Sequence, residues 1–430
     1  MATKKKTAKV TKPRRAVIIA GKRTPFVRAF TSLTKVDSIG LGAAAVRGLL
    51  EDTDLAYRHV EALVWGGVIL PSASPNVGRE IALEIGLPPS AEAMTVTRAC
   101  ASGLQAITLA AAAIERGEYD IAIAGGSDST SNAELKMPQK LVHTVAPVAM
   151  SSKSGAKDWL GVAAQLRPKM LMPQQPKIAE RSTGQLMGEA AEEMAGRNSI
   201  SREDQDALAA ASHHRASAAK EHLAKEITPV GKVTEDGMVR GDTSAEKLAR
   251  LRPVFAKDGT LTAGNSSGLT DGGAAVLLMS EEKALELGYK PLAAFKSWSY
   301  VGVDPADQLL IGPALAMPKA LERAGLELSD IDLVDMHEAF AAQVLSVLKV
   351  MGSESFAKER LGRDKGVGQV DRERFNIYGG SIALGHPFGA TGARMVTTMA
   401  NALHREDKQT ALLGICAAGG LGAAAVLERV

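Results

Sequence analysis

Short apolar runs alternate with segments of helical periodicity over the first 131 residues. Residues 16–20 (AVIIA) are typical of a buried strand, and Asp37 precedes a helical run that it is suited to cap. Strands are expected at residues 16–20, 60–70, 93–96 and 121–124, and helices at residues 37–51, 78–85 and 104–116. Strands separated by helices predict an α/β fold with a mostly parallel sheet and helices on both of its faces.

The segment 104–114 (LQAITLAAAAI) is apolar nearly all round, so the helix that it forms should be buried on every side. Such a helix has to lie between two sheets, and outer helices would bring the number of layers to five. The 42 glycines and the many alanines suit this core, because small side chains let helices and strands approach closely.

The composition changes between residues 132 and 256. Residues 136–180 are rich in Lys, Pro, Ser and Met and have no strand pattern, and amphipathic helices are expected at 183–196 and 201–223. Strand character returns at 274–279. We therefore expect residues 132–256 to form a largely helical subdomain inserted into the first α/β unit.

The C-terminal part repeats the order of elements found near Cys100. A small-residue turn, a helix and a strand that ends in glycines follow Cys100, and the same order follows His386. Two halves of one design would place these two residues at matching helix N-termini. A pseudo-two-fold axis would then bring the two helix ends together.

Length and composition narrow the class of protein. A chain of 430 residues, 45% hydrophobic and 23% charged, indicates two or three packed globular units. No apolar run reaches the roughly 20 residues that span a bilayer. Two cysteines exclude a disulfide scaffold and a cysteine-rich metal site, and they indicate a reducing compartment. We expect a cytoplasmic protein with at most peripheral membrane contact and no bound metal.

Residues 1–15 carry seven Lys and Arg residues and no acidic residue, and without them the net charge of +3 becomes −4. We expect a disordered basic tail, with contact to nucleic acid or anionic lipid as the alternative. The tail lacks the pattern of a signal or transit peptide. The remaining chain has no basic stripe, so nucleic acid is not expected as a partner.

Four residues stand where chemistry is expected. Cys100 precedes the buried helix, whose N-terminal N–H groups favour a thiolate. His386 lies in a glycine-rich turn, and His337 and Cys416 each lie at the carboxyl end of an apolar strand, where α/β sheets bind ligands. Each alone could be a structural residue. Together they indicate acyl transfer by a thiol and an imidazole; a four-ligand zinc site is the alternative, but no ligand pair has a close metal-binding spacing.

Five segments resemble the signature segments of the thiolases and occur in that family's order: VTRACASGLQAI, GTLTAGNSSGLTDGGAAVLLMS, HEAFAAQ, NIYGGSIALGHPFGATGAR and CAAGGLGAA. The resemblance covers the chain from about Arg15 to its end. It implies a five-layered αβαβα fold of two βαβαβαββ halves with a helical loop domain in the first. The N-terminal half would comprise residues 16–131 and 257–290, the loop domain residues 132–256, and the C-terminal half residues 291–430.

The resemblance also implies roles for individual residues. Cys100 resembles the nucleophile that becomes acylated, His386 the base that activates it and binds the thioester oxygen, and Cys416 the acid/base for the α-carbon proton. His337 stands where the family usually has Asn, and we expect it to take the oxyanion role, directly or through a water. The backbone N–H of Ala418 resembles an oxyanion donor, which requires a negative φ at this alanine.

The HEAF motif, the CAAGG turn and the segment LMPQQPKIAERSTGQLMGEAAEEMA resemble the thiolase (β) subunits of fatty-acid oxidation and trifunctional complexes. In those relatives the segment that matches residues 136–177 is an extra helical insert that contacts the partner subunit or a membrane. An ordinary surface excursion is the alternative here. The resemblance implies a homodimer or tetramer and leaves open a hydratase/dehydrogenase α subunit as partner.

The implied activity is that of a 3-ketoacyl-CoA thiolase (acetyl-CoA C-acyltransferase) of β-oxidation. An acetoacetyl-CoA thiolase that condenses acetyl-CoA is the first alternative, and a non-catalytic lipid-binding or scaffold relative is the second. A decarboxylating ketosynthase would carry a histidine in place of Cys416. Met187 and Gly188 resemble residues that line the pantetheine tunnel, and Ser267 resembles the serine that binds pantetheine. Coenzyme A and acyl-CoA are expected as substrates, without a permanently bound cofactor.

Overall fold

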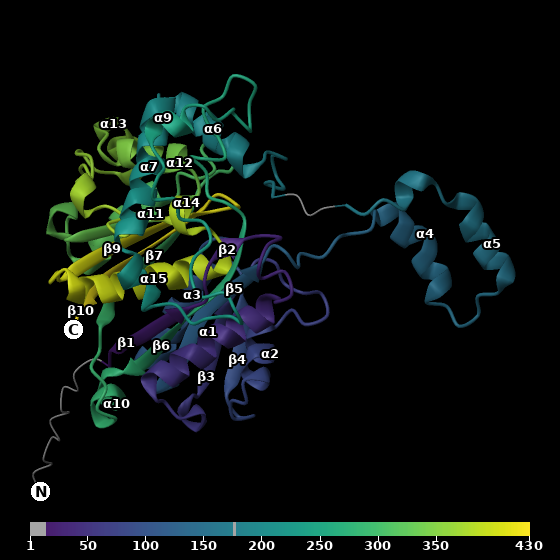
Figure 1. The fold of residues 1–430 in the computed structure, drawn as a ribbon, viewed down its shortest axis with the longest axis horizontal. Helices are drawn as coiled ribbons and strands as arrows, with labels where there is room; N and C mark the ends of the chain where they lie inside the picture. Colours follow the sequence, from purple (N-terminus) through teal and green to yellow (C-terminus); the bar gives the residue numbers. More distant parts are fainter. Residues whose placement is uncertain (1–13, 175–177) are drawn as a thin grey trace, which may run out of the picture.

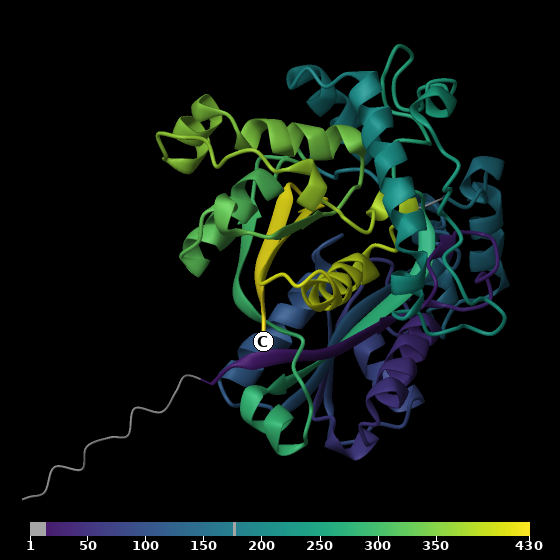
Figure 2. The ribbon, with the colours of Figure 1, turned by 60° about the vertical axis from the view of Figure 1, so that its left-hand side comes forward.

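Two α/β halves make up the body of the molecule in the computed structural model, which describes residues 14–174 and 178–430 (Figures 1 and 2). The elements of the first half are β1 (Ala16–Arg23), β2 (Val27–Arg28), α1 (Ser38–Thr53), β3 (Ala62–Gly66), α2 (Val77–Glu84), β4 (Glu92–Val96), α3 (Ser102–Glu115), β5 (Ile121–Ser129) and β6 (Thr270–Ser280). The short helix α10 (Glu281–Glu286) leads into the second half.

The second half repeats this design, except that an isolated bridge between Val334 and Phe375 stands in place of a strand equivalent to β4. Its elements are β7 (Ala293–Gly302), α11 (Pro313–Ala324), β8 (Leu333–Met336), α12 (Ala341–Met351), α13 (Glu354–Phe356), α14 (Ser381–Leu384), α15 (Gly389–Arg405), β9 (Thr410–Ala417) and β10 (Leu421–Arg429). Helices α3 and α15 therefore hold equivalent places, each of them following one of the loops in which chemistry was expected.

The strands run in the order β4-β3-β5-β6-β1-β7-β10-β9-β8. Strands β1 and β7 join the two halves through only two residue pairs, Val17 with Ala294 and Ile18 with Ala293. The long ladder is therefore two sheets that touch at one corner, and each half keeps its own sheet.

The prediction of a mostly parallel sheet is wrong. Only the pairs β3–β4, β3–β5 and β8–β9 are parallel, and the other pairs are antiparallel. The cause is plain at β9 and β10, which the tight turn 418–420 joins as a hairpin, because a short connection permits only antiparallel pairing.

The five predicted layers are present. Along β6, Val276 and Leu278 point into the central core with α3 and α15, whereas Leu277 and Met279 point into the outer core with α1 and α2. The second sheet divides its side chains in the same way between the central layer and an outer core that includes α11 and α12. Most of α3 is buried, including the large side chains Leu104, Ile107 and Ile114. A stripe of Gln105, Leu109 and Ala112 is only partly buried, so the prediction of burial on every side holds for the rest of the helix.

Helix α1 illustrates how a local signal sets an element. Asp37 has extended backbone angles, and its carboxylate accepts the N–H of Gly40 at 2.8 Å, so it caps the helix as predicted. The chain leaves the helix at Asp54, which is in the left-handed conformation (φ 51°).

Between β5 and β6 the α-helices of the described chain are α4 (Gln139–Ala149), α5 (Ala156–Gln165), α6 (Met187–Arg197), α7 (Arg202–Ala218), α8 (Lys220–Ala224) and α9 (Ala245–Leu248), joined by long irregular segments. Helices α4 and α5 stand away from the body as an arm (Figure 1). Within the described ranges, no helix has both the length and the apolar character needed to cross a bilayer.

Most of the predicted basic tail, residues 1–13, lies outside the described residues. Arg14 and Arg15 are described, and they form ion pairs with Asp120 and Glu428 respectively. The two ion pairs thus connect the start of β1 to the residue before β5 in the first half and to β10 in the second half.

Candidate active site

The loop before α3 places Cys100 through its backbone. Ala99 has a left-handed conformation (φ 45°), which is uncommon for a residue with a side chain. The hydroxyl of Ser102 accepts the N–H of Arg98 at 2.8 Å and donates to the carbonyl of Ala99 at 2.6 Å. These bonds close a tight turn, and Cys100 stands immediately before the N-cap residue of α3, Ala101.

The loop before α15 has the same outline. Gly385 (φ 98°) ends α14, and Phe388 (φ 28°) is the N-cap residue of α15. The N–H of Gly389, in the first turn of α15, donates to the carboxylate of Asp128 at 2.7 Å. His386 therefore precedes α15 much as Cys100 precedes α3.

The two helix N-termini meet, as the internal repeat predicted. A Cβ atom on Gly103 would lie 2.4 Å from the carbonyl oxygen of Gly389, and one on Gly392 would lie 2.5 Å from the backbone nitrogen of Leu104. Backbone touches backbone here, so only glycine fits at these two positions. This approach brings the two loops together.

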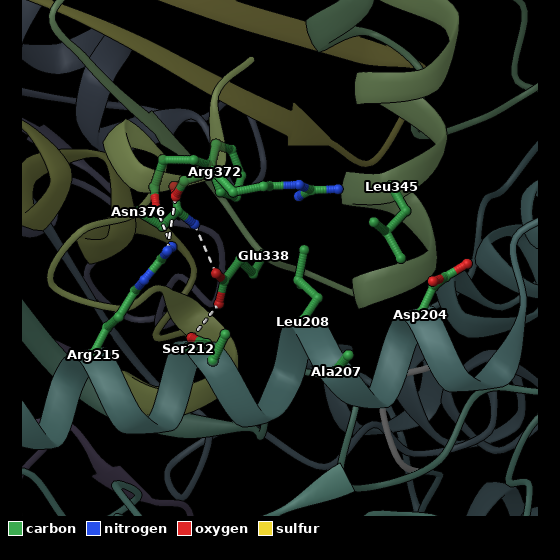
Figure 3. A pocket seen from close by; sticks show the side chains of 11 residues that line it. Asp204, Ala207, Leu208, Ser212, Arg215, Glu338, Leu345, Arg372 and Asn376 are labelled. Carbon is green, nitrogen blue, oxygen red and sulfur yellow. Dashed lines mark hydrogen bonds between the residues drawn. The ribbon is translucent and has the colours of Figure 1, made fainter. Parts of the chain in front are cut away.

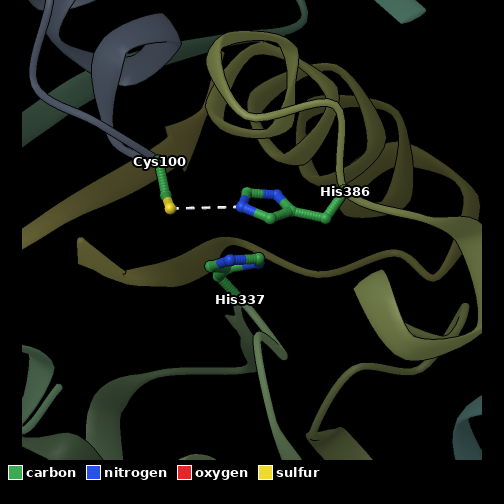
Figure 4. Close-up of side chains that lie close together, drawn as sticks. All are labelled: Cys100, His337 and His386. Carbon is green, nitrogen blue, oxygen red and sulfur yellow. Dashed lines mark hydrogen bonds between the residues drawn. The ribbon is translucent and has the colours of Figure 1, made fainter. Parts of the chain in front are cut away.

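Three predicted side chains form one cluster (Figure 4). The sulfur of Cys100 lies 3.1 Å from Nε2 of His386, and the ring of His337 stands 4.1 Å from that of His386, centroid to centroid. The sulfur and one ring nitrogen of each histidine all lie within 4.8 Å of one another, a spacing that would also admit a metal ion. Cys100 is partly exposed, whereas both histidines are buried.

Cys416 lies at the end of β9 and is fully buried. Its side chain packs in the outer core with α11 and α12, and it is close enough to Cys100 for that thiolate to raise its pKa, which burial already holds well above the usual value. The N–H of Ala418 reaches Cys100 as a donor that lowers the pKa of that thiol. The positive φ angles of this turn are at Gly419 (84°) and Gly420 (64°).

At Cys100, burial opposes the N–H groups that were expected to favour a thiolate. Burial raises the pKa of Cys100 to about 12, although the N–H groups of Ala418 and Cys100 itself lower it. Burial, followed by the charge of Arg394, lowers the pKa of His386 to about 3. Near neutral pH a thiol therefore faces a neutral imidazole, and the ion pair has to form when the substrate is attacked.

Each imidazole is held from behind by a hydroxyl. Nδ1 of His386 lies 2.7 Å from the hydroxyl of Thr391, and Nδ1 of His337 lies 2.8 Å from that of Ser381. The sequence analysis did not identify either hydroxyl. Their place within the segment NIYGGSIALGHPFGATGAR was the available signal, because a glycine-rich turn that positions a histidine needs partners for it.

Glu338 follows His337 and fixes this loop from the other side. Its carboxylate accepts from the hydroxyl of Ser212 at 2.7 Å, from the side-chain amide of Asn376 at 2.7 Å and from the N–H of Ile382 at 3.2 Å. Glu338 therefore ties the end of β8 to α7 and to the start of α14.

A cavity of about 240 Å³ opens beside Glu338, between α7 and the chain before α14 (Figure 3). Arg215 and Arg372 line it, and the four predicted catalytic side chains do not. The cavity is thus separate from the cluster around Cys100.

Asp128 is a further residue of this region that was not predicted from the sequence. It is buried at the end of β5 and accepts from the N–H groups of Val68, Ile69 and Gly389. Burial raises its pKa to about 7. Its position at the carboxyl end of an apolar strand was a signal in the sequence.

Of the predicted coenzyme A residues, Ser267 has contacts close to the cluster. Ser267 donates its N–H to Ala339 at 2.9 Å, and Leu269, two residues on, forms a bridge with His386. A Cβ on Gly188 would collide with the ring of Phe255 at 2.3 Å.

Met187, the residue before it, is partly buried at the start of α6. None of these contacts involves a ligand, so the assignment of Met187, Gly188 and Ser267 to a pantetheine tunnel stays a prediction.

Comparisons with known families match nearly the whole chain. Residues 16–282 match the family described as "Thiolase, N-terminal domain", and residues 289–429 match "Thiolase, C-terminal domain". Curated proteins named 3-ketoacyl-CoA thiolase are similar over 423 residues, or 96% of this chain and 97% of theirs. Those of Colwellia psychrerythraea and of Yersinia enterocolitica are each 44% identical to it.

Two solved structures are also similar. The acetyl-CoA acetyltransferase of Bacillus anthracis superposes with a TM-score of 0.81 at 32% identity. The human mitochondrial 3-ketoacyl-CoA thiolase superposes with a TM-score of 0.80 at 30% identity. Each comparison covers 97% of this chain and 99% of the other.

Proposed function

The chain belongs to the thiolase family, and from this premise we infer that it is a 3-ketoacyl-CoA thiolase, which cleaves 3-ketoacyl-CoA with coenzyme A into acetyl-CoA and a shortened acyl-CoA. The observation that carries this function is the 3.1 Å approach of the Cys100 sulfur to Nε2 of His386 where two helix N-termini meet. A nucleophile within reach of a base is the arrangement that acyl transfer needs.

In the first step the S–H proton of Cys100 passes to Nε2 of His386 while the sulfur attacks the 3-keto carbon. A carbon–sulfur bond forms, and the carbonyl becomes an oxyanion. The N–H groups of Cys100 and Ala418 converge beside this sulfur and are placed to hold that oxygen. Donors of this kind each contribute about 3–4 kcal/mol in the transition state.

In the second step the oxyanion collapses and the C2–C3 bond breaks. Its electron pair becomes the enolate of acetyl-CoA, whose thioester oxygen faces His386 and His337. The thiol of Cys416 gives its proton to C2, and acetyl-CoA leaves. The acyl group stays on Cys100 as a thioester.

In the third step coenzyme A enters and its thiol proton passes to the Cys416 thiolate. The coenzyme A sulfur attacks the acyl-Cys100 carbonyl, and a shortened acyl-CoA leaves. Cys100 recovers its proton from His386. The covalent intermediate divides the reaction, so ping-pong kinetics are expected.

An acetoacetyl-CoA thiolase is the second candidate, because the similar structure from Bacillus anthracis is an acetyl-CoA acetyltransferase. Thiolysis rates measured from C4 to C16 3-ketoacyl-CoA distinguish the two. We expect turnover to extend well beyond C4; a monotonic fall from C4 would assign the short-chain activity instead. A chain that gave no thiolysis and no acylated Cys100 with any of these substrates would not be a thiolase.

Coenzyme A and acyl-CoA are proposed as substrates, held by Met187, Gly188 and Ser267, and no permanently bound cofactor or metal is proposed. The cluster spacing would admit a metal ion, but Nε2 of His386 already faces the thiol. Dialysis against a chelator should leave thiolysis unchanged. Lost activity that returned with a divalent cation would replace this proposal with a metal site.

The arm formed by α4 and α5 supports a proposed partner, an α subunit with hydratase and dehydrogenase activities. The arm exposes large apolar side chains, among them Met150 (86%) at the end of α4 and Leu160 (71%) on α5. Apolar surface of this extent marks an interaction site. Replacing Met150 and Leu160 by serine should abolish association with such a subunit and leave thiolysis of the separate chain intact.

We also propose a homodimer or tetramer in the cytoplasm. Strand β4 ends the order of strands and is only partly buried, so its edge is open to a second copy. The two free cysteines, Cys100 and Cys416, suit a reducing compartment. Light scattering of the purified chain tests the oligomeric state, and a monomer would contradict it.

A further inference from the structure

Ser381 stands between a guanidinium and an imidazole in the buried interior. Its hydroxyl oxygen lies 3.3 Å from a terminal nitrogen of Arg394 and 2.8 Å from Nδ1 of His337. Arg394 is fully buried and also donates to Asp335 at 3.2 Å. Asp335 lies on β8, two residues before His337. The contacts that run from Asp335 through Arg394 and Ser381 to His337 therefore start and finish at the carboxyl end of β8.

The direction of each hydrogen bond follows from counting protons. A guanidinium has donors and no acceptor, so the hydroxyl oxygen of Ser381 accepts from Arg394. The hydroxyl oxygen could also accept from a protonated Nδ1 of His337, but the O–H of Ser381 would then be buried without an acceptor, because its other contact among the described residues is the Arg394 donor. The O–H is therefore assigned to Nδ1 of His337, which must be unprotonated to accept it. Burial, with the charges of His386 and Arg394, lowers the pKa of His337, so the ring is neutral. A neutral imidazole with a bare Nδ1 carries its proton on Nε2.

Nε2 of His337 has no hydrogen-bond partner among the described residues, although the side chain is fully buried. Leaving a buried N–H unpaired costs roughly 1–3 kcal/mol, so such an atom calls for an explanation. The ring faces His386, next to Cys100. A substrate oxygen in that space would complete the missing bond.

His386 needs the opposite tautomer. Its Nε2 faces the thiol of Cys100 at 3.1 Å and has to be bare to take the thiol proton. Its proton then sits on Nδ1 and is donated to the hydroxyl of Thr391 at 2.7 Å. Two rings 4.1 Å apart would thus present a lone pair and an N–H to the same small space.

We propose that Ser381 and Arg394 are positioning residues that hold His337 in its Nε2–H tautomer, so that the ring donates directly to the thioester oxygen of the departing enolate. This inference rests on the proposed thiolase activity for its catalytic meaning. The tautomer itself is a property of the resting protein and can be measured without turnover.

The kinetic test is a double-mutant cycle. Removing one preorganised oxyanion donor costs about 10²–10³-fold in kcat. We expect His337→Ala to fall in this range and Ser381→Ala to lower kcat roughly tenfold, because the ring stays in place with a mixed tautomer. KM should change little in Ser381→Ala. In the His337→Ala background, Ser381→Ala should cost less than twofold.

The matched control is Ser299→Ala. Ser299 is equally buried, and its hydroxyl donates to the carbonyl of Ala316 at 2.6 Å, away from the cluster. This variant should keep the wild-type kcat. If Ser381→Ala lowers kcat by the same factor with and without His337, its role is structural and the proposal fails.

The spectroscopic test needs no activity. Histidine ¹⁵N spectra distinguish the two neutral tautomers, and the chain has eight histidines. The signals lost in His337→Asn identify His337. We expect a protonated Nε2 in the wild type and a mixture in Ser381→Ala; a protonated Nδ1 in the wild type would overturn the proposal even in an active thiolase. If the tautomer is as expected but no 3-ketoacyl-CoA is cleaved, the proposed function fails and the tautomer assignment stands.

Discussion

The loops before α3 and before α15 each hold a reactive side chain next to a helix N-terminus, but they are fixed by different contacts. Both end at a helix N-terminus, and both contain one non-glycine residue with a positive φ, Ala99 (45°) and Phe388 (28°). The first loop is fixed by the hydrogen bonds of Ser102 to the backbone of the same loop. The second presents His386, whose ring is fixed by the hydroxyl of Thr391.

The difference follows from what each group has to do. A thiol nucleophile needs small neighbours and nearby N–H groups, and a tight backbone turn supplies both. An imidazole that exchanges a proton needs a defined tautomer, which only a partner on its other nitrogen can provide. The duplicated fold thus offers two equivalent helix ends, and the side chains around them give one the nucleophile and the other the base.

The largest effect is expected for Cys100→Ser. A serine hydroxyl in the same turn lacks the nucleophilicity of sulfur, and the base beside it is a neutral imidazole. We expect kcat for thiolysis to fall by about 10⁴-fold or more. Mass spectrometry should find no acyl group on the protein after incubation with 3-ketoacyl-CoA.

Cys416, which remains in this variant, serves as an internal control, because it should not become acylated. An acyl group found on Cys416, or a full steady-state rate, would remove the nucleophile from the first loop. Either result would contradict the assignment of the nucleophile to the loop before α3 and of the base to the loop before α15.

A smaller loss is expected for Cys416→Ala. This thiol handles the proton of the α-carbon, and general acid–base groups contribute roughly 10²–10⁴-fold. Acylation of Cys100 by an acyl-CoA should persist, while exchange of the acetyl-CoA α-protons with deuterated water should slow by that factor. Wild-type exchange rates would exclude Cys416 from the mechanism.

Alkylation of Cys100 tests its resting state. Because the pKa of Cys100 is raised to about 12 and only the thiolate reacts, inactivation by iodoacetamide should speed up about tenfold for each unit between pH 7 and pH 10. Alkylation of the Cys100→Ser variant, followed by mass spectrometry because this variant is inactive, measures any reaction elsewhere. If the rate instead reached its plateau already below about pH 7, Cys100 would be a thiolate at neutral pH, which is the form that the helix N-terminus favours.

The sequence predicted the five layers, the burial of most of helix α3 and the meeting of Cys100 with His386, because local periodicity and the internal repeat carry that information. It gave the wrong pairing direction for most strands, since pairing depends on which strands become neighbours. The boundaries of the loop domain remain predictions.

The residues that position His337 could not be predicted from the sequence for a similar reason. Ser381 and Arg394 come from the neighbouring helices α14 and α15, and their contact with Asp335 and His337 depends on how these helices pack against the end of β8, much earlier in the chain. The resting thiol was also beyond reach, because the helix N-terminus is a local feature, whereas burial depends on the whole fold. Burial has the larger effect on the pKa here.

The smallest effect concerns the strained backbone of the first loop. A non-glycine residue in the left-handed region costs roughly 1–2 kcal/mol, and glycine costs about 0.5–1 kcal/mol in unfolded-state freedom. Ala99→Gly should therefore leave the free energy of unfolding, and with it the thermal midpoint, unchanged or slightly higher. The control Ala112→Gly, inside α3, should lower the free energy of unfolding by about 1 kcal/mol. Equal losses would mean that the turn stores no strain. Phe388 offers no such separable test, because its buried ring stands 5.1 Å from that of His386, so strain and packing are joined in the second loop.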